Sequence, residues 1–106
     1  MPKTIRIDEG KVVVVARLVA QRGKEDQVLE ALHGLIKQTR DEPGCLRYEL
    51  NQSIDDPRTF TFIEKFESDA AFEVHKNAPY ITCFFREVAP RLLETQQIVL
   101  HREILP

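Results

Sequence analysis

Two ionisable side chains lie in otherwise apolar patterns, and both can exchange protons. Glu64 interrupts a stretch in which every second residue is a phenylalanine, and His75 follows Phe72 by three residues, a spacing that puts both on one side of a helix. A buried carboxyl group pairs with a positive charge or takes a proton, and histidine titrates at about pH 6.5. We therefore predict acid–base chemistry, with His75 as the base or anchor and Glu64 as the carboxylate that orients it.

Both residues also have a purely structural interpretation. His75 can pack beneath a sheet with its ring bonded to a backbone carbonyl or a carboxylate. Glu64 can form an ion pair with Arg17, Arg47 or His75 itself. The residue pattern leaves the structural and the catalytic interpretation open for each.

Aromatic residues follow the same segments and can line a pocket for a flat aromatic substrate. The expected substrate-binding residues are Tyr48, Phe62, Phe66, Tyr80, Phe84 and, at the rim, the anion-binding Arg17. Aromatic stripes at helical spacing also occur as plain core. Arg17 has a similar alternative, in which its stem covers apolar surface while its charge reaches water.

The remaining reactive residue types are weaker candidates. Nothing near Cys83 in the sequence would lower the pKa of its thiol, which argues against a nucleophile. The spacing of Cys45 and Cys83 matches no metal site, so we expect no metal and two free thiols in a reducing compartment. His33 is expected at the surface, and His101 at the surface or an interface.

Composition limits the class of protein. With 106 residues, 42% hydrophobic and 30% charged, the chain is expected to form one globular domain at 11–106 behind an N-terminal arm at 1–10. A net charge of −2 with dispersed lysines and arginines gives no reason to expect nucleic-acid binding. No apolar run approaches the roughly 20 residues of a membrane span, and no signal-peptide core is present, so we expect a cytoplasmic protein.

Two periodicities alternate along the chain. A period of two predicts four strands, at 12–19, 45–54, 59–67 and 94–104. Helical spacing predicts helices at 25–42, at 69–76 and from Pro79 onward. The order β-α-β-β-α-β predicts an α+β, ferredoxin-like fold with a four-stranded antiparallel sheet and both helical segments on one face.

The other face of that sheet is expected to be apolar. It carries either Val13, Val15 and Val19, which share a face with Arg17, or the alternate residues of that strand. A contiguous apolar face usually marks an interface, so we expect a homodimer built face to face. The long last strand is expected to extend beyond its own sheet, toward the partner.

Several segments of the chain resemble one known family. They are VVVVARLVAQRGKEDQV, EPGCLRYEL, FTFIEKFESDAAFEVH and the helix start Ala78-Pro79-Tyr80. From about Val12 to Ile104 the chain resembles the antibiotic biosynthesis monooxygenase (ABM) family of the dimeric α+β barrel superfamily. Glu64, Phe66 and His75 match that family's usual glutamate, aromatic and histidine.

The resemblance implies an activity. The family's commonest chemistry is oxygenation of quinols and polyketide anthrones without a cofactor, since the electron-rich substrate itself reduces dioxygen. The protein would then supply an apolar pocket and a base. A haem-degrading branch is disfavoured, because Ala16, Phe66 and Phe84 or Phe85 stand where that branch has asparagine, tryptophan and histidine.

Two alternatives remain open. One is isomerisation of a small phosphorylated diketone formed in autoinducer breakdown, with Lys76 or Arg17 holding the phosphate. The other is a dimer that binds a small molecule without turnover.

Overall fold

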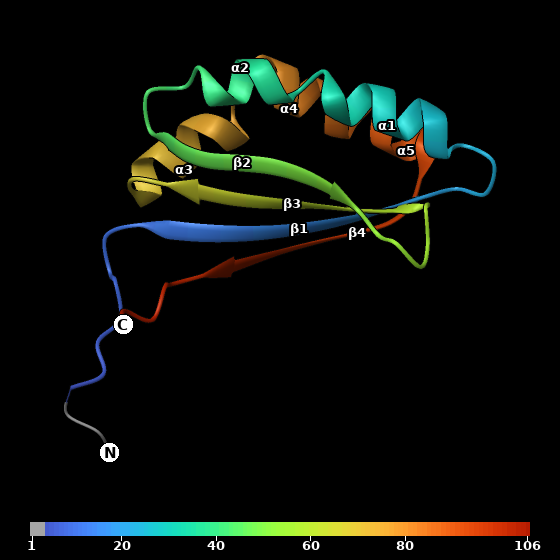
Figure 1. Cartoon of the computed structure of the whole chain (residues 1–106). Coiled ribbons are helices and arrows are strands. Elements are labelled where there is room, and N and C mark those ends of the chain that lie inside the picture. Colours follow the sequence, from blue (N-terminus) through green and yellow to red (C-terminus); the bar gives the residue numbers. More distant parts are fainter. Residues whose placement is uncertain (1–3) are drawn as a thin grey trace.

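The structure, a computed structural model, describes residues 4–106. Its elements are β1 (Val12–Ala20), α1 (Glu25–His33), α2 (Ile36–Arg40), β2 (Cys45–Gln52), β3 (Thr59–Phe66), α3 (Asp69–Lys76), α4 (Pro79–Cys83), the π-helical turn η1 (Phe84–Val88), α5 (Ala89–Leu92) and β4 (Leu93–His101). The strands form one antiparallel sheet in the order β2-β3-β1-β4. All helices cover the same face of it (Figure 1). The predicted ferredoxin-like fold is confirmed.

Alternation along β3 builds the covered face of the sheet. Phe60, Phe62, Glu64 and Phe66 are all buried, whereas the residues between them are only partly covered. Successive side chains of a strand point to opposite faces, so the glutamate shares the helix-covered side with the phenylalanines. The alternation thus places one carboxyl group inside an aromatic layer.

The first helical segment is interrupted where one helix was predicted. Gly34 separates α1 from α2, and the Leu35 amide donates to the Leu32 carbonyl at 3.1 Å, a tighter three-residue bond. Glycine is a poor helix former, which explains the break at this position. The predicted apolar stripe nevertheless faces the sheet, since Val28 and Leu32 are buried.

The second helical segment starts at a capping serine, restarts at a proline and contains one turn that was not predicted. Ser68 caps α3 by accepting a bond from the Ala71 amide, and Pro79 opens α4 at its first turn. The π-helical turn η1 follows because Pro90 has no amide hydrogen to continue the α-helical ladder. This wider turn leaves two consecutive aromatic residues, Phe84 and Phe85, packed toward the core.

Two apolar residues of the predicted strand at 45–54 are exposed. Leu46 lies at a bulge between β2 and β3 and is 51% exposed. Ile54 lies beyond the end of β2, in the turn, and is 99% exposed. A bulge shifts the alternation of side chains by one residue, which the sequence pattern did not reveal.

The two ends of the chain pair with each other. The Asp8 amide donates to the Glu103 carbonyl at 2.8 Å, and Ile7 bridges Ile104. This short ribbon projects away from the sheet (Figure 1), so the last strand leaves the sheet after His101. Residues 1–3 of the expected arm lie outside the described residues.

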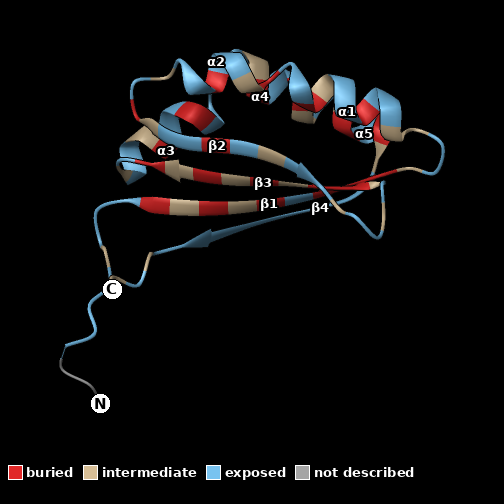
Figure 2. Ribbon diagram, in the orientation of Figure 1, coloured by how far each residue is buried: buried red, intermediate tan, exposed pale blue. Residues whose placement is uncertain are grey.

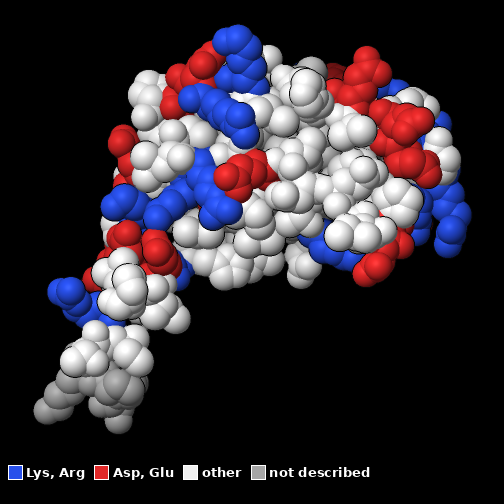
Figure 3. Space-filling model, in the orientation of Figure 1, with Lys and Arg blue, Asp and Glu red and all other residues white. Residues whose placement is uncertain are grey.

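Strand β4 is exposed from Glu94 to His101 (Figure 2). It forms one edge of the sheet, and three consecutive apolar residues, Ile98, Val99 and Leu100, are each at least 40% exposed. On the molecular face in Figure 3, positive and negative side chains are interspersed rather than gathered into a basic patch. The apolar residues of the edge are therefore the more distinctive surface feature.

Candidate active site

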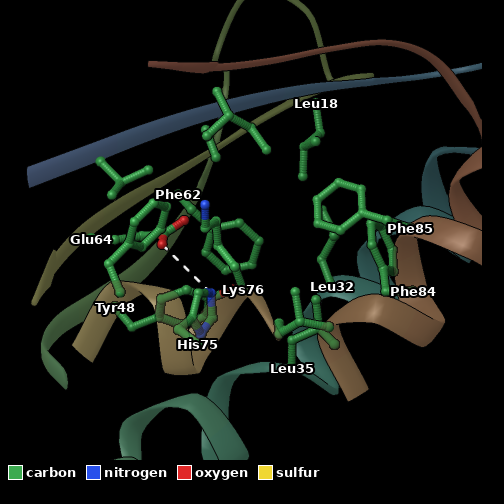
Figure 4. A pocket seen from close by; sticks show the side chains of 15 residues that line it. Leu18, Leu32, Leu35, Tyr48, Phe62, Glu64, His75, Lys76, Phe84 and Phe85 are labelled. Atoms are coloured by element: carbon green, nitrogen blue, oxygen red, sulfur yellow. Dashed lines mark ion pairs between the residues drawn. The ribbon is translucent and has the colours of Figure 1, made fainter. Parts of the chain in front are cut away.

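A cavity of about 80 Å³ lies between the sheet and the helices. Aliphatic and aromatic side chains make up most of its wall (Figure 4). Polar atoms enter it from Tyr48 on β2, Glu64 on β3, and His75 and Lys76 on α3. The cavity thus has one polar end inside an apolar shell.

Glu64 is a buried carboxyl group at the polar end. It is 4% exposed, and burial, followed by the charge of Glu42, raises its pKa to about 8. Its Oε1 lies 3.8 Å from His75 Nε2, which is longer than a hydrogen bond. Glu64 is therefore protonated at neutral pH and close to the point at which it can release its proton.

His75 is held from several sides. Its Nδ1 lies 3.1 Å from Glu42 Oε2, and its Nε2 faces Glu64. The ring packs against Phe66, with ring centroids 4.9 Å apart, and edge-on to Tyr48 at 5.6 Å. The closer carboxylate partner of His75 is thus Glu42, and the two ring nitrogens face two different carboxyl groups.

Glu42 was not singled out by the sequence. Its Oε2 accepts a hydrogen bond from the Tyr80 hydroxyl as well as contacting His75. The close approach of Gly44 to α3 brings Glu42 there, because a Cβ on Gly44 would lie 2.4 Å from the Ala71 Cβ. One signal was available, since a carboxylate at the C-terminal end of a helical segment is unfavourable for the helix dipole.

The two tyrosines stay protonated around neutral pH. Burial, and next the charge of Glu64, raises the pKa of Tyr48 well above its usual value. Burial and the hydrogen bond to Glu42 raise the pKa of Tyr80 to about 12. Both are therefore hydrogen-bond donors, and neither serves as a base.

The structure separates the predicted substrate-binding residues into two groups. Tyr48, Phe62 and Phe84 line the cavity. Phe66 lies behind the His75 ring, and Tyr80 contacts Glu42 instead of the cavity. The last two residues therefore support the site from outside its wall.

The placement of Arg17 at the pocket rim was wrong. Arg17 is exposed and pairs in register with Thr61 and Gln97, on the sheet face opposite the helices. The sheet itself separates its guanidinium from the cavity. The same geometry removes Arg17 as a partner of Glu64.

Neither a metal centre nor a membrane segment is evident in the described chain. Among residues 4–106, no three histidine, cysteine, aspartate or glutamate side chains converge as a metal site would require. Within the same residues, no helix has the length and apolarity needed to cross a membrane.

The family model and a similar solved structure carry the same family description. The family model described as antibiotic biosynthesis monooxygenase matches residues 11–87. The crystal structure of SO0527 from Shewanella oneidensis is 38% identical, with a TM-score of 0.95 over 96% of this chain and 99% of that one. A solved structure described as an antibiotic biosynthesis monooxygenase is 28% identical, with a TM-score of 0.80 over 90% of this chain and 99% of that one.

A curated relative from Synechocystis, sll1783, is 23% identical over 91 residues, which are 86% of this chain. This chain spans 62% of the length of that protein. The family match covers well over half of the chain and includes both Glu64 and His75. The chain belongs to the antibiotic biosynthesis monooxygenase family.

Proposed function

We propose that this protein is a cofactor-independent monooxygenase that oxidises a quinol or a related small aromatic with dioxygen. The observation that carries the proposal is the pair of His75 and Glu64 at the polar end of an apolar cavity. An acid–base pair is what such a substrate needs, because the phenolate reduces dioxygen far more readily than the phenol does. The family membership supports the same chemistry.

The reaction balances with the substrate and dioxygen alone. His75 Nε2 takes the phenolic proton, and the phenolate gives one electron to dioxygen. The resulting radical and superoxide combine at a ring carbon that carries hydrogen, and protonation gives a hydroperoxide. Loss of water then leaves a carbonyl. One oxygen atom enters the product, the other leaves as water, and the substrate as a whole loses the four electrons that dioxygen accepts.

Glu64 and the apolar wall have separate roles in this scheme. The Glu64 carboxylic acid supplies the proton to the peroxide and recovers one from His75, a task that suits a group with a pKa of about 8. Leu18, Leu32 and Phe62 exclude water from the radical pair.

The size of the cavity limits the substrate. A volume of about 80 Å³ is well below the roughly 300 Å³ at which pockets for drug-sized ligands begin. A single ring is therefore the best fit, and a larger substrate requires movement of Lys76, which is half exposed. Lys76 lies over the Phe72 ring at 5.3 Å and pairs with Glu73 at 2.8 Å.

The phosphorylated diketone isomerase has less support. Of its two expected phosphate ligands, Arg17 lies across the sheet and Lys76 is already paired with Glu73. Recognition of a phosphate commonly uses an arginine fork or several donors together. The mostly apolar wall favours an aromatic substrate instead.

Oxygen uptake tests the proposal. Protein treated with a chelator is mixed with a panel of reduced quinones and anthrones, and the rate is compared with autoxidation in buffer. We expect saturable uptake, with one atom of ¹⁸O₂ in the product. Thermal stabilisation by these compounds without oxygen uptake would instead identify a binding protein without turnover.

We also propose that the open face of the sheet is covered by a second copy of the chain. Val15 lies opposite Ile63 on β3 and opposite Val99 on β4, so an apolar row crosses three strands. Ile63 is partly exposed and Val99 is 40% exposed in the single chain. Covering this row against an identical row removes apolar surface from water, which favours a twofold dimer.

Sedimentation velocity tests the dimer. We expect the wild type to sediment as a dimer at micromolar concentration and Val15→Asp to weaken the dimer by about 100-fold or more, because a carboxylate would be buried without a partner. Leu29→Asp, on the exposed side of α1, is the matched control and should remain dimeric. A folded wild-type monomer at this concentration would contradict the proposal.

A cytoplasmic location is proposed on the chemistry of the cysteines. Cys45 and Cys83 are both free, and Cys83 is exposed. Free exposed thiols persist in reducing compartments and are oxidised elsewhere.

A further inference from the structure

Two side chains converge on one oxygen of Glu42. The Tyr80 hydroxyl donates to Oε2, and His75 Nδ1 lies 3.1 Å from the same atom. An ionised carboxylate only accepts hydrogen bonds, so the imidazole nitrogen that faces it must carry hydrogen. The contact with Tyr80 fits this ionised form, since the tyrosine supplies a second donor.

We infer that Glu42 is a positioning residue that holds His75 in its Nδ1–H tautomer and leaves the Nε2 lone pair directed toward Glu64 and the cavity. The assignment of the proton does not depend on the reaction. Its catalytic meaning rests on the proposed function, in which Nε2 must be free to accept the phenolic proton.

Distances distinguish Glu42 from the other carboxyl group near His75. The 3.1 Å contact of Nδ1 with Glu42 is within hydrogen-bond range, whereas the 3.8 Å separation of Nε2 from Glu64 exceeds it. If Glu64 controlled the ring, Nε2 would carry hydrogen and donate to Glu64. The observed geometry favours control from the Nδ1 side.

Burial explains why the contact between Glu42 and His75 persists. The side chain of Glu42 is 12% exposed and that of His75 is 6% exposed, so water cannot replace either partner easily. Within the described residues, Glu42 Oε1 is buried without a hydrogen-bond partner. The polar contacts of the carboxylate are therefore concentrated on Oε2, the atom that faces His75 and Tyr80. Burying a carboxylate in this way is costly, and its two hydrogen bonds offset part of that cost.

Nitrogen NMR reads the tautomer directly and needs no substrate. Long-range ¹H–¹⁵N correlation spectra of uniformly labelled protein distinguish a protonated ring nitrogen from one with a lone pair, above about pH 6.5, where free histidines are neutral. The exposed residue His33 is the internal reference and should show the Nε2–H form usual for partner-free histidines. We expect His75 to show the opposite form, Nδ1–H.

Three variants test which side chain determines the tautomer of His75. Glu42→Leu removes the acceptor and should shift His75 toward the Nε2–H form expected for His33. Tyr80→Phe is the matched control, because it removes the other donor on Glu42 but keeps the contact with Nδ1. Glu64→Gln should also leave the Nδ1–H form in place.

The wild-type spectrum alone can overturn the inference if Glu42→Leu fails to fold. A wild-type His75 with hydrogen on Nε2, or with both nitrogens protonated throughout the pH range, would refute it. A change of tautomer in Glu64→Gln but not in Glu42→Leu would mean that Glu64, and not Glu42, determines the tautomer of His75. If His75 carries hydrogen on Nδ1 but the protein consumes no oxygen, the proposed reaction is refuted. The assignment of Glu42 as the residue that positions His75 still holds in that case.

Discussion

Replacing His75 with alanine is expected to lower the rate of oxygen consumption by about 10²- to 10⁴-fold, the range that a positioned acid–base group contributes. The substitution removes the Nε2 atom that accepts the phenolic proton. It also leaves Glu42 with Tyr80 as its remaining partner at Oε2. The effect should fall on kcat more than on KM, because most of the cavity wall is apolar and stays in place.

The matched control for this prediction is His33→Ala. His33 lies at the exposed end of α1, away from the cavity, and the variant should keep the wild-type rate. Circular dichroism and sedimentation velocity check that each variant is folded and sediments as the wild type does. Equal rates for His75→Ala and the wild type, with both folded, would remove His75 from the mechanism.

A double variant tests whether His75 and Glu64 act as one unit. If the histidine takes the proton and the carboxyl group passes one on, then removing either breaks the same sequence of steps. Glu64→Gln in the His75→Ala background should therefore lower the rate of oxygen consumption by a much smaller factor than Glu64→Gln alone.

The strand pattern predicted the location of Glu64 because alternation is a local property. Phe60, Phe62 and Phe66 assign one face of β3 to the core, and the glutamate between them must follow. The same logic grouped Arg17 with Val13 and Val15. Which face the helices cover depends on the whole topology, and that decided against a pocket role for Arg17.

Glu42 shows what the sequence could not supply. It meets His75 across 33 positions of the chain, through a close approach of Gly44 to Ala71. No periodicity relates two such residues, so their contact follows only from tertiary packing. The π-helical turn before Pro90 is a similar case, because helical spacing predicted a helix from Pro79 onward and did not predict the wider turn within it.

The pH dependence of folding stability gives a second test of the site, independent of any substrate. Burial raises the pKa of Glu64 to about 8 from its ordinary value of 4.5. Between these values the folded chain keeps a proton that the unfolded chain has lost. The stabilisation is therefore complete below about pH 4.5 and is lost progressively as the pH rises through about 8.

Glu64→Gln removes this dependence, since glutamine is neutral at every pH and has nearly the same shape. The stability of the variant relative to the wild type should rise by up to about 1.4 kcal/mol per pH unit across that window, reaching several kcal/mol. Urea unfolding at matched protomer concentration measures it, because a dimer's apparent stability depends on concentration. Glu30→Gln, on the exposed side of α1, makes the same change in charge without burial and should follow the wild type. Parallel curves for Glu64→Gln and the wild type would mean that Glu64 is ionised in the fold, and the proton that we assign to it for the peroxide step would not be there.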